Sequence, residues 1–242
     1  MLRGIVVSLA MCSFAFAAAL RTSQIRTSVI EPQLSASAPR TADGKPDLSG
    51  VWRAIHDRYL TNLAADGIRV PFLPQAAAEY KKRQANRGKG RPSDRCLPRG
   101  VPSAMLARDR PWKIVQTPAA ITLLFDDSLH FRQIFTDGRG FPEDPAPTWF
   151  GYSIARWEGE TLVAETIGLN TETWLDDGGH PHTEALRATE RFRRPTVGTM
   201  SIDITIDDSK AYTKPWTATV RFELRPDAEL GEHVCAVNSK PQ

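Results

Sequence analysis

Short runs in which hydrophobic and polar residues alternate recur along most of the chain. In residues 200–206 every second position is Met or Ile, and in residues 216–224 every second position is Trp, Ala, Val, Phe or Leu. A two-residue period places the apolar side chains on one face of an extended strand, so each run predicts a half-buried β-strand. Similar runs occur at residues 51–55, 112–116, 121–125, 131–135, 152–157, 161–167 and 186–194.

Turn-forming sequences separate these runs, for example Asp126-Asp127-Ser128 and Glu158-Gly159-Glu160. About nine such strands in sequence predict an all-β, mainly antiparallel fold. Because an open sheet leaves two unpaired edges, we expect the strands to close into an up-and-down barrel. One short helix is expected at residues 75–84, where Pro74 precedes an alanine-rich run.

The first nineteen residues have the pattern of a secretory signal peptide. A cationic start, Met1-Leu2-Arg3, leads into an apolar run that contains the cleavage pattern Ala15-Phe16-Ala17. Residues 20–45 are rich in Ser, Thr and Ala and are expected to be a flexible linker. Residues 46–242 are then predicted to form one barrel domain, exported to the periplasm or the extracellular space, with no membrane span.

Two of the three cysteines, Cys96 and Cys235, lie outside the predicted signal peptide. An even pair in an oxidising compartment predicts one disulfide, which would tie the middle of the chain to its end. The alternative is two unpaired buried thiols.

The start of the predicted domain resembles the G-x-W entry of the lipocalins and the wider calycin group of barrels. The motif consists of Gly50, Val51 and Trp52 within the run Asp47–Trp52. The resemblance implies that Trp52 closes one end of a barrel beneath a ligand cavity. The alternative is an ordinary strand start with a buried tryptophan. The long segment between the first two strands departs from the lipocalin pattern.

A broader similarity covers most of the chain and is to an uncharacterised family of secreted bacterial proteins. It implies export but brings no activity with it. It rests on the runs 43–52, 95–98, 135–139, 157–163 and 179–182.

Charge is unevenly distributed, although the net charge is only +3. Residues 79–113 are rich in Lys and Arg, whereas residues 126–184 are rich in Asp and Glu. The two segments either neutralise each other in the fold, or the basic one attracts an anionic ligand to the barrel mouth. Nucleic acid is not expected, because the basic segment lacks interleaved aromatic residues. The chain also lacks a phosphate-binding loop and a nucleophile elbow.

The segment Trp174–Glu184 concentrates two histidines and three carboxylates between two predicted strands. If the chain is extended after Pro181, then His182, Glu184 and Glu190 share the inward face. Glu190 on this apolar face needs a partner, for which Arg156 is the candidate, or it serves as a general acid or base.

Three interpretations of the two histidines stay open. His180 and His182 could present two imidazoles to zinc, with Asp176, Asp177, Glu184 or His233 supplying the remaining ligands. His182 could act as a base oriented by Asp176 or Asp177. The segment could also be a rigid structural loop. We expect no metal and no cofactor.

These features lead to two functional hypotheses. The first is an exported barrel that binds a small, largely apolar ligand, with or without an acidic group, in its cavity. The second is a small-molecule lyase, isomerase or hydrolase with His182, Glu190, Asp176 and Asp177 as catalytic residues. The proline-rich loop at residues 137–149 is expected to be a lid or a structural strap. The predicted ligand-binding residues are Trp52, Arg156, Trp174, His180, His182, Glu184 and Glu190.

Overall fold

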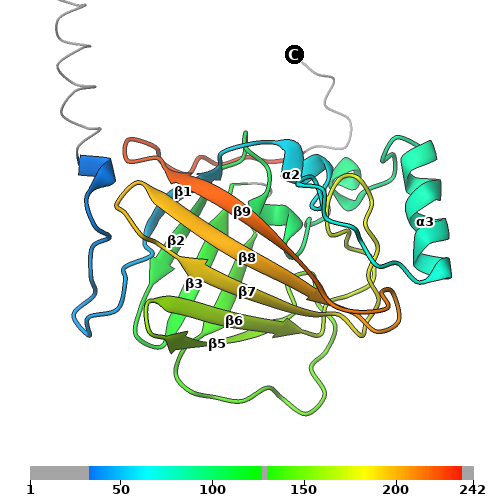
Figure 1. The fold of residues 1–242 in the computed structure, drawn as a ribbon. Coiled ribbons are helices and arrows are strands. Elements are labelled where there is room, and N and C mark those ends of the chain that lie inside the picture. Colours follow the sequence, from blue (N-terminus) through cyan, green and yellow to red (C-terminus); the bar gives the residue numbers. More distant parts are fainter. Residues whose placement is uncertain (1–32, 127–129, 236–242) are drawn as a thin grey trace, which may run out of the picture.

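The computed structural model describes residues 33–126 and 130–235, which form a closed nine-stranded barrel (Figure 1). The expected signal peptide and the first part of the expected linker, residues 20–32, lie outside the described residues. The all-β barrel predicted from the alternating pattern is therefore confirmed. Its strands are β1 (Gly50–Ala54), β2 (Trp112–Gln116), β3 (Ala120–Phe125), β4 (Phe131–Phe135), β5 (Tyr152–Glu158), β6 (Thr161–Ile167), β7 (Arg187–Arg193), β8 (Thr199–Asp207) and β9 (Trp216–Leu224).

Consecutive strands are neighbours, and β9 pairs with β1 to close the barrel. Every pair is antiparallel except β4 and β5, which run parallel and share only the residue pairs Ile134–Ser153 and Phe135–Ile154. The parallel pair was not expected from the sequence. It exists because residues 136–151 carry the chain back along the outside of the barrel before β5 begins, below β5 in Figure 1.

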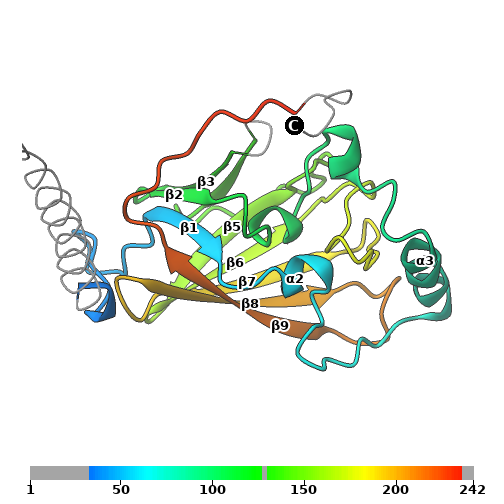
Figure 2. The same cartoon turned by 90° about the horizontal axis from the view of Figure 1, so that it is seen from above.

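The segment between β1 and β2 covers the end of the barrel at which β6 and β8 end. It contains α2 (Arg58–Thr61), α3 (Pro74–Ala85) and 3-10 helices at Pro92–Arg95 and Ser103–Met105. The expected helix at residues 75–84 is therefore confirmed as α3, which projects from one end of the molecule (Figure 2). Buried side chains of the segment, including Leu63 and Met105, join the barrel core. The barrel mouth on this side is consequently occupied by the protein's own chain.

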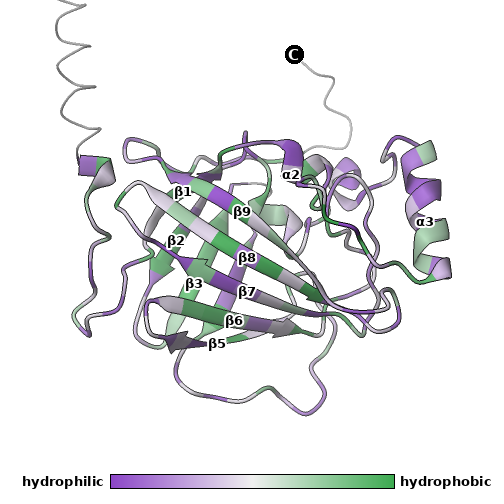
Figure 3. Cartoon of the chain, in the orientation of Figure 1, coloured by the Kyte–Doolittle hydropathy of each residue, from purple (hydrophilic) through white to green (hydrophobic). Residues whose placement is uncertain are grey.

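Side chains alternate between buried and accessible positions along most strands, most clearly in β8 and β9. Figure 3 shows the corresponding mixture of hydrophobic and hydrophilic residues along each strand. The inward positions hold large residues such as Trp112, Phe192 and Phe222. Trp52 is fully buried among them. Its indole N–H donates to the carbonyl oxygen of Leu48 at 3.0 Å, and the guanidinium of Arg194 lies over its ring, 4.9 Å from the centroid.

Two further segments are held against the barrel. Residues 33–45, the described part of the expected linker, pair with it through bonds such as Val197 N to Ala36 O at 2.8 Å. Loop 137–149 is anchored by a β-bridge between Thr148 and Leu169, which favours a structural strap over a lid. The predicted disulfide is present, since Cys96 and Cys235 are bonded. In the described ranges, no helix has the length and apolar character needed to cross a bilayer.

Candidate functional site

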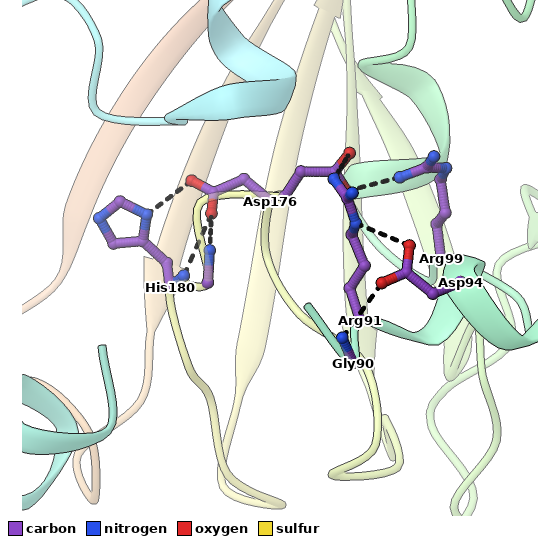
Figure 4. Close-up of polar contacts among 8 residues, drawn as sticks. Gly90, Arg91, Asp94, Arg99, Asp176 and His180 are labelled. Atoms are coloured by element: carbon purple, nitrogen blue, oxygen red, sulfur yellow. Dashed lines mark hydrogen bonds and ion pairs between the residues drawn. The ribbon is translucent and has the colours of Figure 1, made fainter. Parts of the chain in front are cut away.

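The histidine loop, residues 174–184, forms a buried junction between the barrel and the covering segment. Its centre is a contact between His180 Nδ1 and Asp176 Oδ2 at 2.6 Å, with both side chains almost fully buried. Figure 4 shows Asp176 turned toward His180, with Arg91 and Arg99 on the other side of the loop. A His–Asp pair was one of the expected arrangements. However, the histidine that makes it is His180 and not His182.

The carboxylate of Asp176 accepts hydrogen bonds from the chain on both sides of the junction. One oxygen accepts from the backbone N–H groups of Gly179 and His180, and the other accepts from Leu63 N–H and from the His180 ring. Carboxylates with this many donors hold loops in one conformation. The ring of His180 is also packed by aromatic side chains, with Tyr80 at 4.4 Å and Phe72 at 5.6 Å between centroids. These contacts favour the structural interpretation of the loop.

Asp177 binds the basic segment. Its two oxygens lie 2.9 Å from Arg91 Nη1 and 2.6 Å from Arg99 Nη1. Arg95 also lies 4.0 Å from Glu172. Basic residues between 79 and 113 thus meet acidic residues between 126 and 184, as the neutralising interpretation of the charge pattern predicts.

His182 is buried but has a different environment. Its Nε2 lies 2.6 Å from Thr173 Oγ1, and its Nδ1 lies 3.0 Å from the carbonyl oxygen of Thr183. Burial lowers the pKa of His182, and the hydrogen bond with Thr183 opposes this only in part. The ring is therefore kept neutral and is bonded on both sides.

Glu190 is fully buried on the inward face of β7, as the parity of the strand predicts, but its partner is Arg132 and not Arg156. Both carboxylate oxygens contact the guanidinium of Arg132, one of them at 3.1 Å from Nη1. Arg156 points outward from β5 and binds Glu158 and Glu165 on the surface. The expectation for Arg156 was wrong because the strap half-buries Tyr152 on the outward face of β5, so a large residue there does not mark the inward face.

Two further predicted ligand-binding residues lie outside the barrel. Glu184 is exposed and binds Lys210 at 2.6 Å. The chain is not extended after Pro181 as expected, because the N–H of Leu186 donates to the carbonyl oxygen of Thr183 and forms a turn. Trp174 packs under the guanidinium of Arg83, 4.3 Å from the ring centroid, on the α3 side of the loop. The prediction that His182, Glu184 and Glu190 face the barrel mouth together is therefore wrong for Glu184.

A hollow of about 480 Å³ lies over the seam where β4 and β5 diverge. Five aromatic side chains line it, and one of them, Phe131, is 59% exposed. Arg132 and Ser153, which are almost fully buried, also belong to its lining. The aromatic residues are Phe131, Phe135, Trp149, Phe150 and Tyr152.

Sequence reasoning missed this hollow, since its lining within the described residues includes none of the seven predicted ligand-binding positions. Two features of the sequence could have indicated the hollow. Phe131 and Phe135 occupy the outward positions of β4, where polar residues are usual. The run Trp149-Phe150-Gly151-Tyr152 is also strongly aromatic, and a Cβ at Gly151 would lie 2.5 Å from the carbonyl oxygen of Ile167. The glycine therefore permits the close approach of this wall to β6.

Comparison of the chain with protein-family models and with curated proteins finds no match. In the part of the chain that the structure describes, no three His, Cys, Asp or Glu side chains are grouped as a metal site would require.

Gly178→Ala should destabilise the histidine loop. A Cβ at this position would lie 2.2 Å from the carbonyl oxygen of Thr61, so the backbone of α2 or of the loop must shift. We expect a loss of about 1–3 kcal/mol in the free energy of unfolding, measured by urea denaturation. Gly231→Ala is the matched control, because nothing lies within 4 Å of its Cβ. Equal stabilities of the two variants would contradict the proposed junction.

Proposed function

We propose that this protein is an exported, lipocalin-like barrel that binds a small, largely apolar ligand in the hollow at the β4–β5 seam. The observation that carries the proposal is the set of five aromatic rings around a volume of about 480 Å³. Ligand sites are typically concave, mostly apolar and of this size. An exposed phenylalanine such as Phe131 at the edge of such a hollow is also typical of a binding surface.

The position of the hollow differs from the barrel cavity expected for a lipocalin. The mouth of the barrel is closed by the β1–β2 segment and the histidine loop, and the inward positions hold large side chains. The hollow lies instead at the seam between β4 and β5, which only two residue pairs join. A ligand at the seam would lie against aromatic faces and beside Arg132 and Ser153, which also belong to the lining.

The enzymatic alternative receives less support from the same geometry. Its four residues each take a separate partner: His182 with Thr173, Glu190 with Arg132, Asp176 with His180, and Asp177 with two arginines. General acid–base catalysis requires such groups to converge on one reacting atom. Binding is therefore the function that these contacts favour. Export is supported by the disulfide and by the signal-peptide pattern.

N-phenylnaphthylamine, a neutral probe that fluoresces in apolar surroundings, should bind the protein and be displaced by apolar ring compounds. Trp149→Ala removes one wall of the hollow and should weaken probe binding by about tenfold or more. Val115→Ala is the control, because Val115 is also an exposed apolar residue but lies on β2, outside the lining.

The two variants and the wild-type protein would be titrated by fluorescence. Absence of probe binding to the wild-type protein, or equal affinity of the two variants, would contradict binding at the seam.

A further inference from the structure

The charge of Arg132, which belongs to the lining of the hollow, is already neutralised. Arg132 lies 2% exposed, and both of its terminal nitrogens contact the carboxylate of Glu190. Its other partners among the described residues are uncharged hydroxyl groups, with Nε 3.2 Å from Ser153 Oγ and Nη2 2.8 Å from Thr166 Oγ1. Because the carboxylate of Glu190 already binds both terminal nitrogens of Arg132, a second carboxylate cannot bind the guanidinium in the same two-point geometry. Arg132 is therefore presented to the hollow as one half of an ion pair.

The arginines beside the hollow are paired in the same way. Arg139 lies 3.9 Å above the ring of Phe135 and binds the carboxylate of Asp137, with Nε 2.9 Å from Oδ1. A smaller adjoining hollow, which shares His130 and Phe150 with the first, is lined by Arg99 and Arg110. Arg99 binds Asp177 at 2.6 Å, and Arg110 lies 4.0 Å from Asp109. Each arginine at this site thus has a carboxylate partner.

An acidic ligand would have to bury its charge against a surface where the cations are already compensated. Burial of an unpaired anion is unfavourable, and taking Arg132 from Glu190 would leave the buried glutamate without its partner. An uncharged ligand incurs neither cost. Its polar atoms could instead hydrogen-bond to the side chains of Gln133, Thr148 and Tyr152, which lie among the aromatic rings.

From these contacts we infer that the ligand of the seam hollow is an uncharged, ring-containing compound and not an organic acid. The inference rests on the proposed function, because it concerns the same hollow. It narrows the ligand class that the sequence left open, where an acidic group was one of the expected features.

Naphthalene carboxamide and naphthoate provide a matched test, because they share one ring system and differ in charge. Each would compete with N-phenylnaphthylamine for the wild-type protein at about pH 8, where the carboxyl group of naphthoate is ionised. We expect the carboxamide to displace the probe at a concentration about tenfold or more below that of naphthoate. Equal or tighter competition by naphthoate would overturn the inference and leave the proposed function intact. Failure of the probe itself to bind would reject the proposed function.

Glu190→Gln tests the cause of the discrimination. The variant keeps the shape of the side chain but removes the charge that neutralises Arg132, so naphthoate should gain about tenfold relative to the carboxamide. Glu165→Gln is the control, because Glu165 binds Arg156 and Arg187 on the outer surface. If a folded Glu190→Gln variant bound naphthoate and the carboxamide with the same relative affinity as the wild-type protein, this would contradict the role of the ion pair. If that variant does not fold, the ratio measured for the wild-type protein decides the inference.

Discussion

Glu190→Ala should lower the free energy of unfolding by about 3–5 kcal/mol. The carboxylate of Glu190 is fully buried, and it is the charged partner of Arg132, which is almost fully buried as well. Removing the glutamate leaves a guanidinium inside the barrel whose partners among the described residues are the hydroxyl groups of Ser153 and Thr166. A buried charge that has lost its counter-ion is strongly destabilising. Urea denaturation followed by circular dichroism would measure the change.

The matched control is Arg156→Ala, which breaks ion pairs with Glu158 and Glu165 on the outside of the same barrel. The side chain of Arg156 is 60% exposed, so we expect a much smaller loss of stability than for Glu190→Ala. Replacing both buried partners, as Arg132→Met with Glu190→Leu, should recover much of the stability lost in Glu190→Ala. A Glu190→Ala variant as stable as Arg156→Ala would show that the buried pair is not important for the fold.

The Cys96→Ser/Cys235→Ser double variant should lose about 2–5 kcal/mol of stability. The disulfide joins residues that are 139 positions apart, and closing so long a loop restricts the unfolded chain more than a short loop would. Within the native barrel it also fastens residues 225–235, whose side chains are mostly accessible, to the segment that covers the barrel end.

Thermal unfolding of the wild-type protein with and without a reducing agent provides the control. Reduction should lower the midpoint of the wild-type protein to that of the double variant and should leave the double variant unchanged. A wild-type midpoint that does not respond to complete reduction would contradict a stabilising role of the disulfide.

Elements whose signal is local could be predicted from the sequence. Strands β8 and β9 follow from strict alternation, because a strand that is buried on one face repeats its environment every two residues. The helix α3 follows from a proline at the helix start and an alanine-rich run. The inward direction of Glu190 is also correct, since it shares the parity of Ala188 and Phe192 on a regular strand.

Predictions failed where a second part of the chain changed the environment. The parity of β5 was misassigned because the strap half-buries its outward residue Tyr152, with the ring of Phe141 at 6.4 Å. The partner of Glu190 was missed because Arg132 is far from it in the sequence and is brought close only by the arrangement of β4 to β7 in the barrel. The pairing of Asp176 with His180 rather than with His182 depends on the fold of the loop around Leu63 and Tyr80.

The hollow at the seam is a consequence of topology. It exists because β4 and β5 are parallel and diverge, and a long loop between two strands does not by itself specify the direction in which the second strand pairs.

The sequence alone determined the strands, the helix, the disulfide partners and the inward face of β7, because each depends on residue spacing or on the number of cysteines. Only the tertiary structure decided which charges meet inside the barrel, which residues close its mouth and where an aromatic hollow remains. Those properties arise from contacts between residues distant in the chain, and such contacts leave no period in the sequence.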